Sequence, residues 1–223
     1  MSDTKTMVPD KDALARVGRE VRKRLKADRR VHKIPTDDAE IFALGEFATP
    51  NECQRLMHMI DVVAVPSTLY AGTEQEGFRT SYSGNFDSRD PFVAAISRRM
   101  DDTLGLKSAL GETIQGQRYL PGQQFKPHHD FFFPGQSYWE DERRRGGQRS
   151  WTAMLFLNDV PAGGETEFPK LELAITPKEG VLLMWNNAGP DGVPNLSTLH
   201  AGTPVIDGAK YVITKWYRTR KWG

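Results

Sequence analysis

Cysteine is almost absent from this sequence of 223 residues, since Cys53 is the only one. A single cysteine rules out an internal disulfide framework and fits a reducing compartment. No apolar run approaches the roughly 18–20 residues that span a bilayer, and the polar start MSDTKTMVPDKD lacks the apolar core of a secretory signal. We therefore expect a cytoplasmic protein with no membrane partner.

A large excess of one charge is also missing, because the formal net charge is +1. This balance gives no overall indication of nucleic-acid binding. The composition, with 38% hydrophobic and 26% charged residues, suits one soluble domain with a sizeable core, or one domain with an appended arm.

The local exception to this charge balance is the segment 10–33, which contains ten Lys/Arg and four Asp/Glu. Its apolar residues recur every three to four positions and predict a helix with a narrow apolar stripe. We expect residues 1–35 to form a basic helical arm that packs one face on a domain of residues 36–223. Binding of nucleic acid or an acidic partner by this helix is the alternative.

Two further helices carry clear boundary signals. The sequence TPNE from Thr49 is a capping box with proline at the first helical position, and its helix extends to about Asp61. Asp90 is the expected N-cap of the second helix, and Gly105 is the expected residue at its end. The segment 66–89 between them is rich in Gly, Ser, Thr and Tyr and predicts a binding loop or lid.

After Glu112 the pattern changes to short strands separated by turns such as LPGQ, PKEG and IDGA. Short strands after two or three helices predict an α+β, mainly β, double-sheet jelly roll with helices packed against one sheet. The segment 132–150 is a long charged insertion that could cover a site. The expected strands are 113–119, 124–131, 151–158, 164–168, 172–175, 181–186, 197–205 and 210–218.

Histidine and carboxylate side chains are spaced for a metal site in QFKPHHD, residues 124–130. His128 and Asp130 are two residues apart, so on a strand they point to the same face. With His200 in the strand-like run TLHAGTPV, they would form the facial triad of non-heme Fe(II) oxygenases. The competing assignment of His129 is disfavoured, because adjacent side chains diverge in an extended strand.

A 2-oxo acid chelated at such a centre needs a cation for its distal carboxylate. Lys210 meets this need, because it starts the strand that follows His200, across the turn VIDGA. Its long stem and three donors suit a carboxylate in a mostly apolar pocket. Taken alone, Lys210 would be interpreted as a surface lysine beside a strand, and only the triad changes that interpretation.

These residues lie in stretches that resemble the prolyl 4-hydroxylase branch of the Fe(II)/2-oxoglutarate dioxygenases. The matching stretches, within residues 78–218, are FRTS, RYLPGQQFKPHHDFF, GGQRSWTAMLFLNDVPAGGETEFP, KEGVLLMWNN and STLHAGTPVIDGAKYVITKWYR. The resemblance implies a double-stranded β-helix (jelly roll) core. It also implies Fe(II), with 2-oxoglutarate and O2 as co-substrates and ascorbate as a stimulant.

The resemblance also implies roles for individual residues. The iron ligands and catalytic residues would be His128, Asp130 and His200. The residues around 2-oxoglutarate would be Lys210 at its distal carboxylate, Tyr119 and Thr166 as hydroxyl donors, and Trp216 lining the pocket. The residues facing a peptide substrate would be Arg149, Arg79, Ser81 and, in support of the FRTS loop, Glu112.

The activity implied is hydroxylation of an unactivated C–H bond, in a prolyl residue of a protein or peptide. Phe125 stands where prolyl hydroxylases often have tyrosine, and Lys126 where an acidic residue is common. These departures leave the iron chemistry intact but weaken the substrate assignment. The alternatives are a free amino acid or other small metabolite as substrate, a non-catalytic metal-binding jelly-roll module, and a zinc hydrolase. The oligomeric state, monomer or homodimer, stays open.

Overall fold

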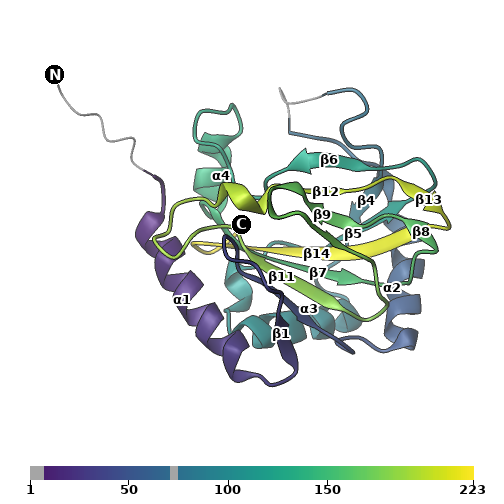
Figure 1. Ribbon diagram of the computed structural model, residues 1–223, viewed down its shortest axis with the longest axis horizontal. Helices are drawn as coiled ribbons and strands as arrows, with labels where there is room; N and C mark the ends of the chain where they lie inside the picture. The colour runs from purple at the N-terminus through teal and green to yellow at the C-terminus, as the bar shows by residue number, and fades with distance from the viewer. Residues whose placement is uncertain (1–7, 71–74) are drawn as a thin grey trace.

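The computed structural model describes residues 8–70 and 75–223. Two antiparallel sheets pack face to face, and helices cover the outer face of the larger one (Figure 1). The larger sheet has the order β1-β2-β11-β7-β14-β5-β4-β3, with β1 Val31–Lys33, β2 Ile41–Leu44, β3 Val65–Pro66, β4 Tyr82–Asn85, β5 Gln115–Tyr119, β7 Arg149–Phe156, β11 Leu182–Asn186 and β14 Lys210–Arg218.

The smaller sheet has the order β10-β9-β12-β6 and lies over the inner face of the larger one (Figure 1). Its strands are β6 Phe125–His128, β9 Thr166–Phe168, β10 Leu173–Ile175 and β12 His200–Gly202, and a separate pair joins β8 Ala162–Gly163 to β13 Val205–Asp207. The helices are α1 Lys11–Ala27, α2 Pro50–Val63, α3 Pro91–Leu104 and α4 Trp139–Arg145, with short 3-10 turns at Ser108–Leu110, Pro169–Leu171 and Leu196–Thr198. The prediction of a mainly β jelly roll with helices against one sheet is confirmed.

The boundaries of α2 and α3 follow their capping residues. The Thr49 side chain accepts a hydrogen bond from the Glu52 backbone N–H, and the Glu52 carboxylate accepts one from the Thr49 N–H. The Asp90 carboxylate accepts two backbone N–H groups at the start of α3. Gly105 ends α3 with φ at 70°, a left-handed conformation that glycine adopts at little cost. All of these caps were predicted.

The N-terminal helix is shorter than predicted. Its apolar stripe is buried, but α1 ends at Ala27, and the helical interpretation of residues 28–33 is wrong. Asp28 is extended and its carboxylate bonds to Arg30, after which Val31–Lys33 pairs with β2. Residues 1–7 of the expected arm lie outside the described residues, and the boundary at residue 35 stays a prediction.

All eight predicted strands occur, but two differ in ways that matter for the site. The segment 197–205 is broken into a 3-10 turn, β12 and the start of β13. Strand β6 ends at His128, so Asp130 lies beyond the ladder rather than on it. The segment 66–89 contributes β3 and β4, although its residues 71–74 lie outside the described residues, and the insertion 132–150 contains α4.

Two apolar layers hold the fold together. The first lies between the helices and the larger sheet, and the second lies between the two sheets. None of the described helices is both long and apolar enough to cross a membrane. Members of the first layer include Leu56, Ile60, Met100, Leu155 and Ile213, and members of the second include Tyr119, Phe156, Phe168, Trp185 and Val212.

A buried polar cluster joins α3 to the larger sheet. The Lys215 ammonium on β14 pairs with the Asp101 carboxylate and donates to the Ser97 hydroxyl. The Tyr217 hydroxyl donates to the same carboxylate at 2.8 Å. Both charged side chains are almost fully buried, at 2% and 3% exposure, so each depends on the other for charge compensation.

We predict that Asp101→Ala lowers the free energy of unfolding by about 3–5 kcal/mol, because it leaves the Lys215 ammonium buried without a counter-charge. Urea denaturation followed by circular dichroism measures the change. Asp101→Ala/Lys215→Met should be more stable than Asp101→Ala alone, whereas Asp87→Ala at an exposed ion pair should unfold at the wild-type midpoint. An unchanged midpoint for Asp101→Ala would remove the cluster from the stabilising interactions.

Candidate metal centre and substrate cavity

Two side chains from strands of the smaller sheet and one from the residues just after β6 converge at one point. His128 ends β6 and faces His200, which begins β12, as its partner in the antiparallel ladder. Their ring centroids are 4.3 Å apart, and His200 Nε2 lies 3.8 Å from Asp130 Oδ2. One possible ligand atom from each of the three lies within 4.8 Å of the others, and no other group in residues 8–70 and 75–223 meets this test.

Backbone carbonyls fix which ring nitrogen of each histidine is free. His128 Nδ1 is 2.8 Å from the Lys126 carbonyl oxygen, and His200 Nδ1 is 3.0 Å from that of Thr198. Because a carbonyl oxygen only accepts hydrogen bonds, each Nδ1 carries the proton and each Nε2 has its lone pair available. Metal-binding histidines in proteins are held by this kind of contact.

The protonation states suit a divalent cation. Burial, together with repulsion from His200, lowers the pKa of His128 to about 3, so the ring is neutral at physiological pH. Burial alone would raise the pKa of Asp130, but His200, His128 and Arg149 bring it below its ordinary value. Two imidazoles and one carboxylate are the donor set expected for non-heme Fe(II), so the residues present fit that ion.

The Lys210 side chain lies in the space between the sheets, beside this cluster. Lys210 is 3% exposed and donates to the Thr166 hydroxyl at 3.3 Å. Its Nζ is 5.5 Å from the ring of Tyr119, its cross-strand partner, whose hydroxyl donates to Gln117. Burial lowers the pKa of Lys210 to about 7, and attraction to Glu165 offsets this effect only in part. A buried ammonium that is only partly compensated is a binding group for an anion.

The small cavity at Lys210 opens toward the metal cluster. Its wall includes Tyr119, Thr166, Trp216 and all three candidate metal ligands. The free volume is about 40 Å³, little more than one water molecule's share of the liquid. The donor groups of this wall, Lys210 and the Thr166 hydroxyl, suit one carboxylate of a dicarboxylate such as 2-oxoglutarate.

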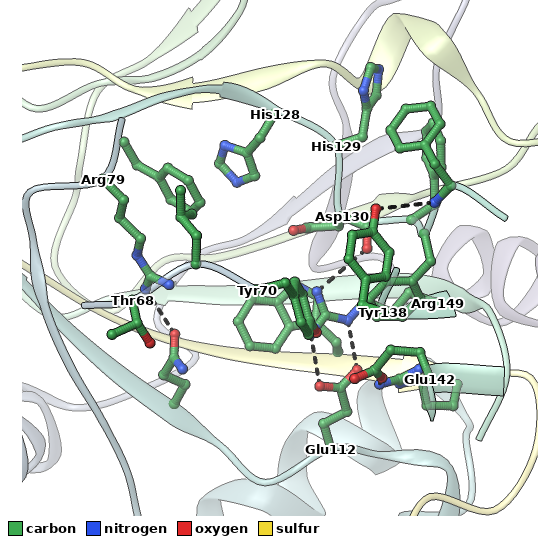
Figure 2. Close-up of a pocket in the computed structure, with 18 of the residues that line it drawn as sticks. Thr68, Tyr70, Arg79, Glu112, His128, His129, Asp130, Tyr138, Glu142 and Arg149 are labelled. Carbon is green, nitrogen blue, oxygen red and sulfur yellow. Dashed lines mark hydrogen bonds and ion pairs between the residues drawn. The ribbon is translucent and has the colours of Figure 1, made fainter. Parts of the chain in front are cut away.

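A much larger cavity of about 630 Å³ reaches the same cluster from outside and has His128 and Asp130 in its wall (Figure 2). Nine of the other residues in its wall are aromatic, and the segments 66–89 and 132–150 both contribute to it. Tyr70 packs on Tyr138 with ring centroids 4.8 Å apart, which joins those two segments. The aromatic residues of the wall are Tyr70, Phe78, Phe125, Phe131, Phe132, Phe133, Tyr138, Trp216 and Trp222.

Arg149 lies in this wall as part of a charge network. Its guanidinium forms a two-pronged ion pair with the Glu112 carboxylate, at 2.7 and 2.9 Å (Figure 2). Arg218 pairs with Glu112 as well and also with Glu142. Glu112 therefore holds two arginines on β7 and β14, and its hydrogen bonds do not reach the FRTS segment that it was expected to support.

Arg79 lies in the cavity wall, but Ser81 does not. The Arg79 guanidinium donates to Gln115 at 2.9 Å and lies 4.7 Å from the centre of the Phe125 ring. Ser81 is 1% exposed. Its hydroxyl accepts a hydrogen bond from Arg79 and contacts the Ser67 hydroxyl, so it stabilises the segment 66–89 without facing the cavity. His129 lies in the wall too, with its Nε2 near the Leu196 carbonyl rather than in the metal cluster.

Sequence reasoning missed two groups around the centre. The Phe125 ring stacks on His128, with centroids 3.6 Å apart and planes at 14°. Thr152 and Asn187, both buried, form a hydrogen-bonded chain to Asp130. The only available signal for Thr152 was a lone hydroxyl in the otherwise apolar strand WTAMLFL.

Comparison with known proteins agrees with this geometry. The model of the 2OG-Fe(II) oxygenase superfamily matches residues 114–218. Prolyl 4-hydroxylase 5 of Arabidopsis thaliana is 32% identical over 200 residues, which are 78% of this chain and 67% of that protein. Prolyl 4-hydroxylase subunit alpha-1 of Rattus norvegicus is 34% identical over 193 residues, but the match covers only 34% of that longer protein.

Solved structures give the same result. The viral collagen prolyl hydroxylase of Paramecium Bursaria Chlorella virus-1, in its 2OG complex, superposes with a TM-score of 0.62 at 26% identity. That match covers 79% of this chain and 94% of the viral one. The chain belongs to the prolyl 4-hydroxylase-like group of the 2OG-Fe(II) oxygenase superfamily. It is accordingly an Fe(II)- and 2-oxoglutarate-dependent dioxygenase, and the binding-module and zinc-hydrolase alternatives are not favoured.

Proposed function

We propose that this enzyme hydroxylates prolyl residues in a protein or peptide, at a centre where His128, Asp130 and His200 bind Fe(II). The large cavity in front of the cluster carries the proposal. Its volume of about 630 Å³ lies in the range of sites for ligands much larger than a free amino acid. Its aromatic walls suit proline-rich segments, which bind in aromatic-lined grooves in other proteins.

The relatives support the same substrate class, because those compared are named as prolyl 4-hydroxylases. When bound, Fe(II) with 2-oxoglutarate and O2 supplies the oxidant that converts a C–H bond to C–OH, with succinate and CO2 as co-products. The protein's own part is to hold, orient and shield the reactants.

Each proposed binding residue has a defined task in this scheme. Lys210 and the Thr166 hydroxyl bind the distal carboxylate of 2-oxoglutarate, with Tyr119 beside them and Trp216 as a wall. In the outer cavity, Arg149 Nη1 lies outside the pair with Glu112 and makes one long hydrogen bond, at 3.5 Å, to the Asp130 carbonyl, so its second hydrogen is available for a substrate carbonyl.

Lys210 makes the binding of 2-oxoglutarate dependent on pH. Its pKa is about 7 in the free protein, and a bound carboxylate raises it. Affinity should therefore be constant below pH 7 and fall by roughly tenfold per pH unit above it, because the free ammonium must then take up a proton on binding. Calorimetric titration of 2-oxoglutarate with Mn(II) in place of Fe(II) measures this slope.

Variants of Lys210, with one control, test whether its titration causes the pH dependence of binding. Lys210→Arg keeps its charge at every pH tested and should lose the slope. Lys210→Met should weaken binding by about 10–100-fold, while Lys178→Met, at an exposed pair with Asp159, should behave as wild type. A pH-independent affinity in the wild type would show that Lys210 does not bind the carboxylate.

The Asp130 carboxylate is predicted to be essential for the iron centre. Anaerobic addition of Fe(II) and 2-oxoglutarate should produce a weak visible charge-transfer band in the wild type, and exposure to O2 should produce succinate. Asp130→Ala should lose both while its circular dichroism spectrum is unchanged, because the removed group is a ligand. Retained succinate formation in Asp130→Ala would remove this residue from the ligand set.

The substrate class is tested by mass spectrometry of proteins from cells that express the wild type or Asp130→Ala. We expect prolyl residues that gain one oxygen atom only with the wild type. If oxygen is gained only in the low-molecular-mass fraction, the substrate is a free amino acid or another metabolite, and the peptide proposal fails while the oxygenase assignment stands.

A further inference from the structure

Asp130 is restrained differently from the two histidines. Each histidine ring bonds to a carbonyl two residues before it, so its orientation is fixed locally. Asp130 follows the end of β6, where no ladder directs its side chain. Its carboxylate is instead held from the larger sheet, by the Thr152 hydroxyl at 2.7 Å.

The donor and acceptor atoms available to these side chains determine the direction of each hydrogen bond. The Thr152 hydroxyl donates its single proton to Asp130 Oδ2 at 2.7 Å. The Thr152 oxygen can then only accept from its other neighbour. Asn187 supplies that donor, because its Nδ2 lies 3.0 Å from Thr152 Oγ1. The chain therefore runs in one direction, from Asn187 through Thr152 to Asp130.

Asn187 is itself held in place at the turn that follows β11. Its backbone N–H donates to the Ser150 backbone carbonyl at 2.8 Å, and its own backbone carbonyl accepts from the Asn195 N–H at 3.0 Å. The preceding residue, Asn186, donates to Glu40, which pairs with Arg22 of α1. All three members of the chain are at least 95% buried, so water does not replace a lost bond easily.

We propose that Thr152 and Asn187 are positioning residues of the metal centre, which act by holding the Asp130 carboxylate toward His128 and His200. This rests on the metal-ligand role proposed for Asp130. Hydrogen-bond partners of metal ligands typically contribute 10–100-fold to metal affinity. The reason is that an unrestrained carboxylate must lose rotational freedom when the metal binds.

The test measures Mn(II) binding to the metal-free protein by calorimetry. Thr152→Val has nearly the shape of threonine but lacks the hydroxyl, and it should bind Mn(II) about 10–100-fold more weakly than wild type. Thr152→Ser keeps the hydroxyl and should recover most of the affinity. The matched control is Ser150→Ala on the same strand, which removes a buried hydroxyl bonded to the Tyr217 carbonyl and should bind Mn(II) as wild type.

The series arrangement predicts a specific non-additivity. Asn187→Ala should weaken Mn(II) binding in the wild type, but should have no further effect in Thr152→Val, because the chain is already broken there. Excess Fe(II) should restore much of the succinate formation of Thr152→Val, since the variant loses metal affinity rather than a reacting group. A fully additive double variant would contradict the chain.

Protein folding and the ligand assignment are tested separately. Thermal melting with and without Mn(II) gives the stabilisation by metal, which depends on affinity and not on the starting stability. If Thr152→Val does not fold, Asn187→Ala and Thr152→Ser carry the test. If folded Thr152→Val binds Mn(II) as wild type, the positioning role is overturned, and if Asp130→Ala also binds as wild type, the proposed ligand set fails instead.

Discussion

Polar bonds between described residues cross the mostly apolar space between the sheets, and two of them lie at the inner cavity and the candidate centre. Lys210 on β14 donates to Thr166 on β9, and Thr152 on β7 donates to Asp130 beyond β6. Apolar packing is non-directional, so it sets how closely the sheets approach but not how individual groups are aimed. Hydrogen bonds in a dry interior have defined geometry and a large cost when unmade, so these two fix the relation of the sheets at the site.

The two cavities differ in how the charges of their wall residues are compensated. In the outer wall, Arg149 and Arg218 are compensated by Glu112 and Glu142, whereas Arg79 donates to the neutral side chain of Gln115. In the inner cavity, the Lys210 ammonium is buried, and Glu165 offsets the effect of its burial only in part. An anion is thus drawn to the inner cavity, whereas the outer cavity discriminates through the shape of its aromatic walls and a few hydrogen-bond donors.

Sequence patterns predicted the features that depend on local chemistry. The caps of α2 and α3, the apolar stripe of α1 and the strands after Glu112 all follow from short-range rules. The pairing of Glu112 with two arginines and the chain to Asp130 join residues up to 106 positions apart, which no periodicity records. The break of 197–205 also needed tertiary information, because His200 must meet His128 on a different strand.

Phe125 connects the substrate side of the cavity to the metal side. Its ring stacks on His128, and the Arg79 guanidinium of the FRTS loop lies 4.7 Å from the same ring. A phenylalanine can make both contacts as well as the tyrosine common in prolyl hydroxylases, because both use the ring face. What the departure removes is a hydroxyl on the cavity wall. The departure therefore keeps the ring contact with the metal ligand, and the wall that it changes belongs to both the outer and the inner cavity.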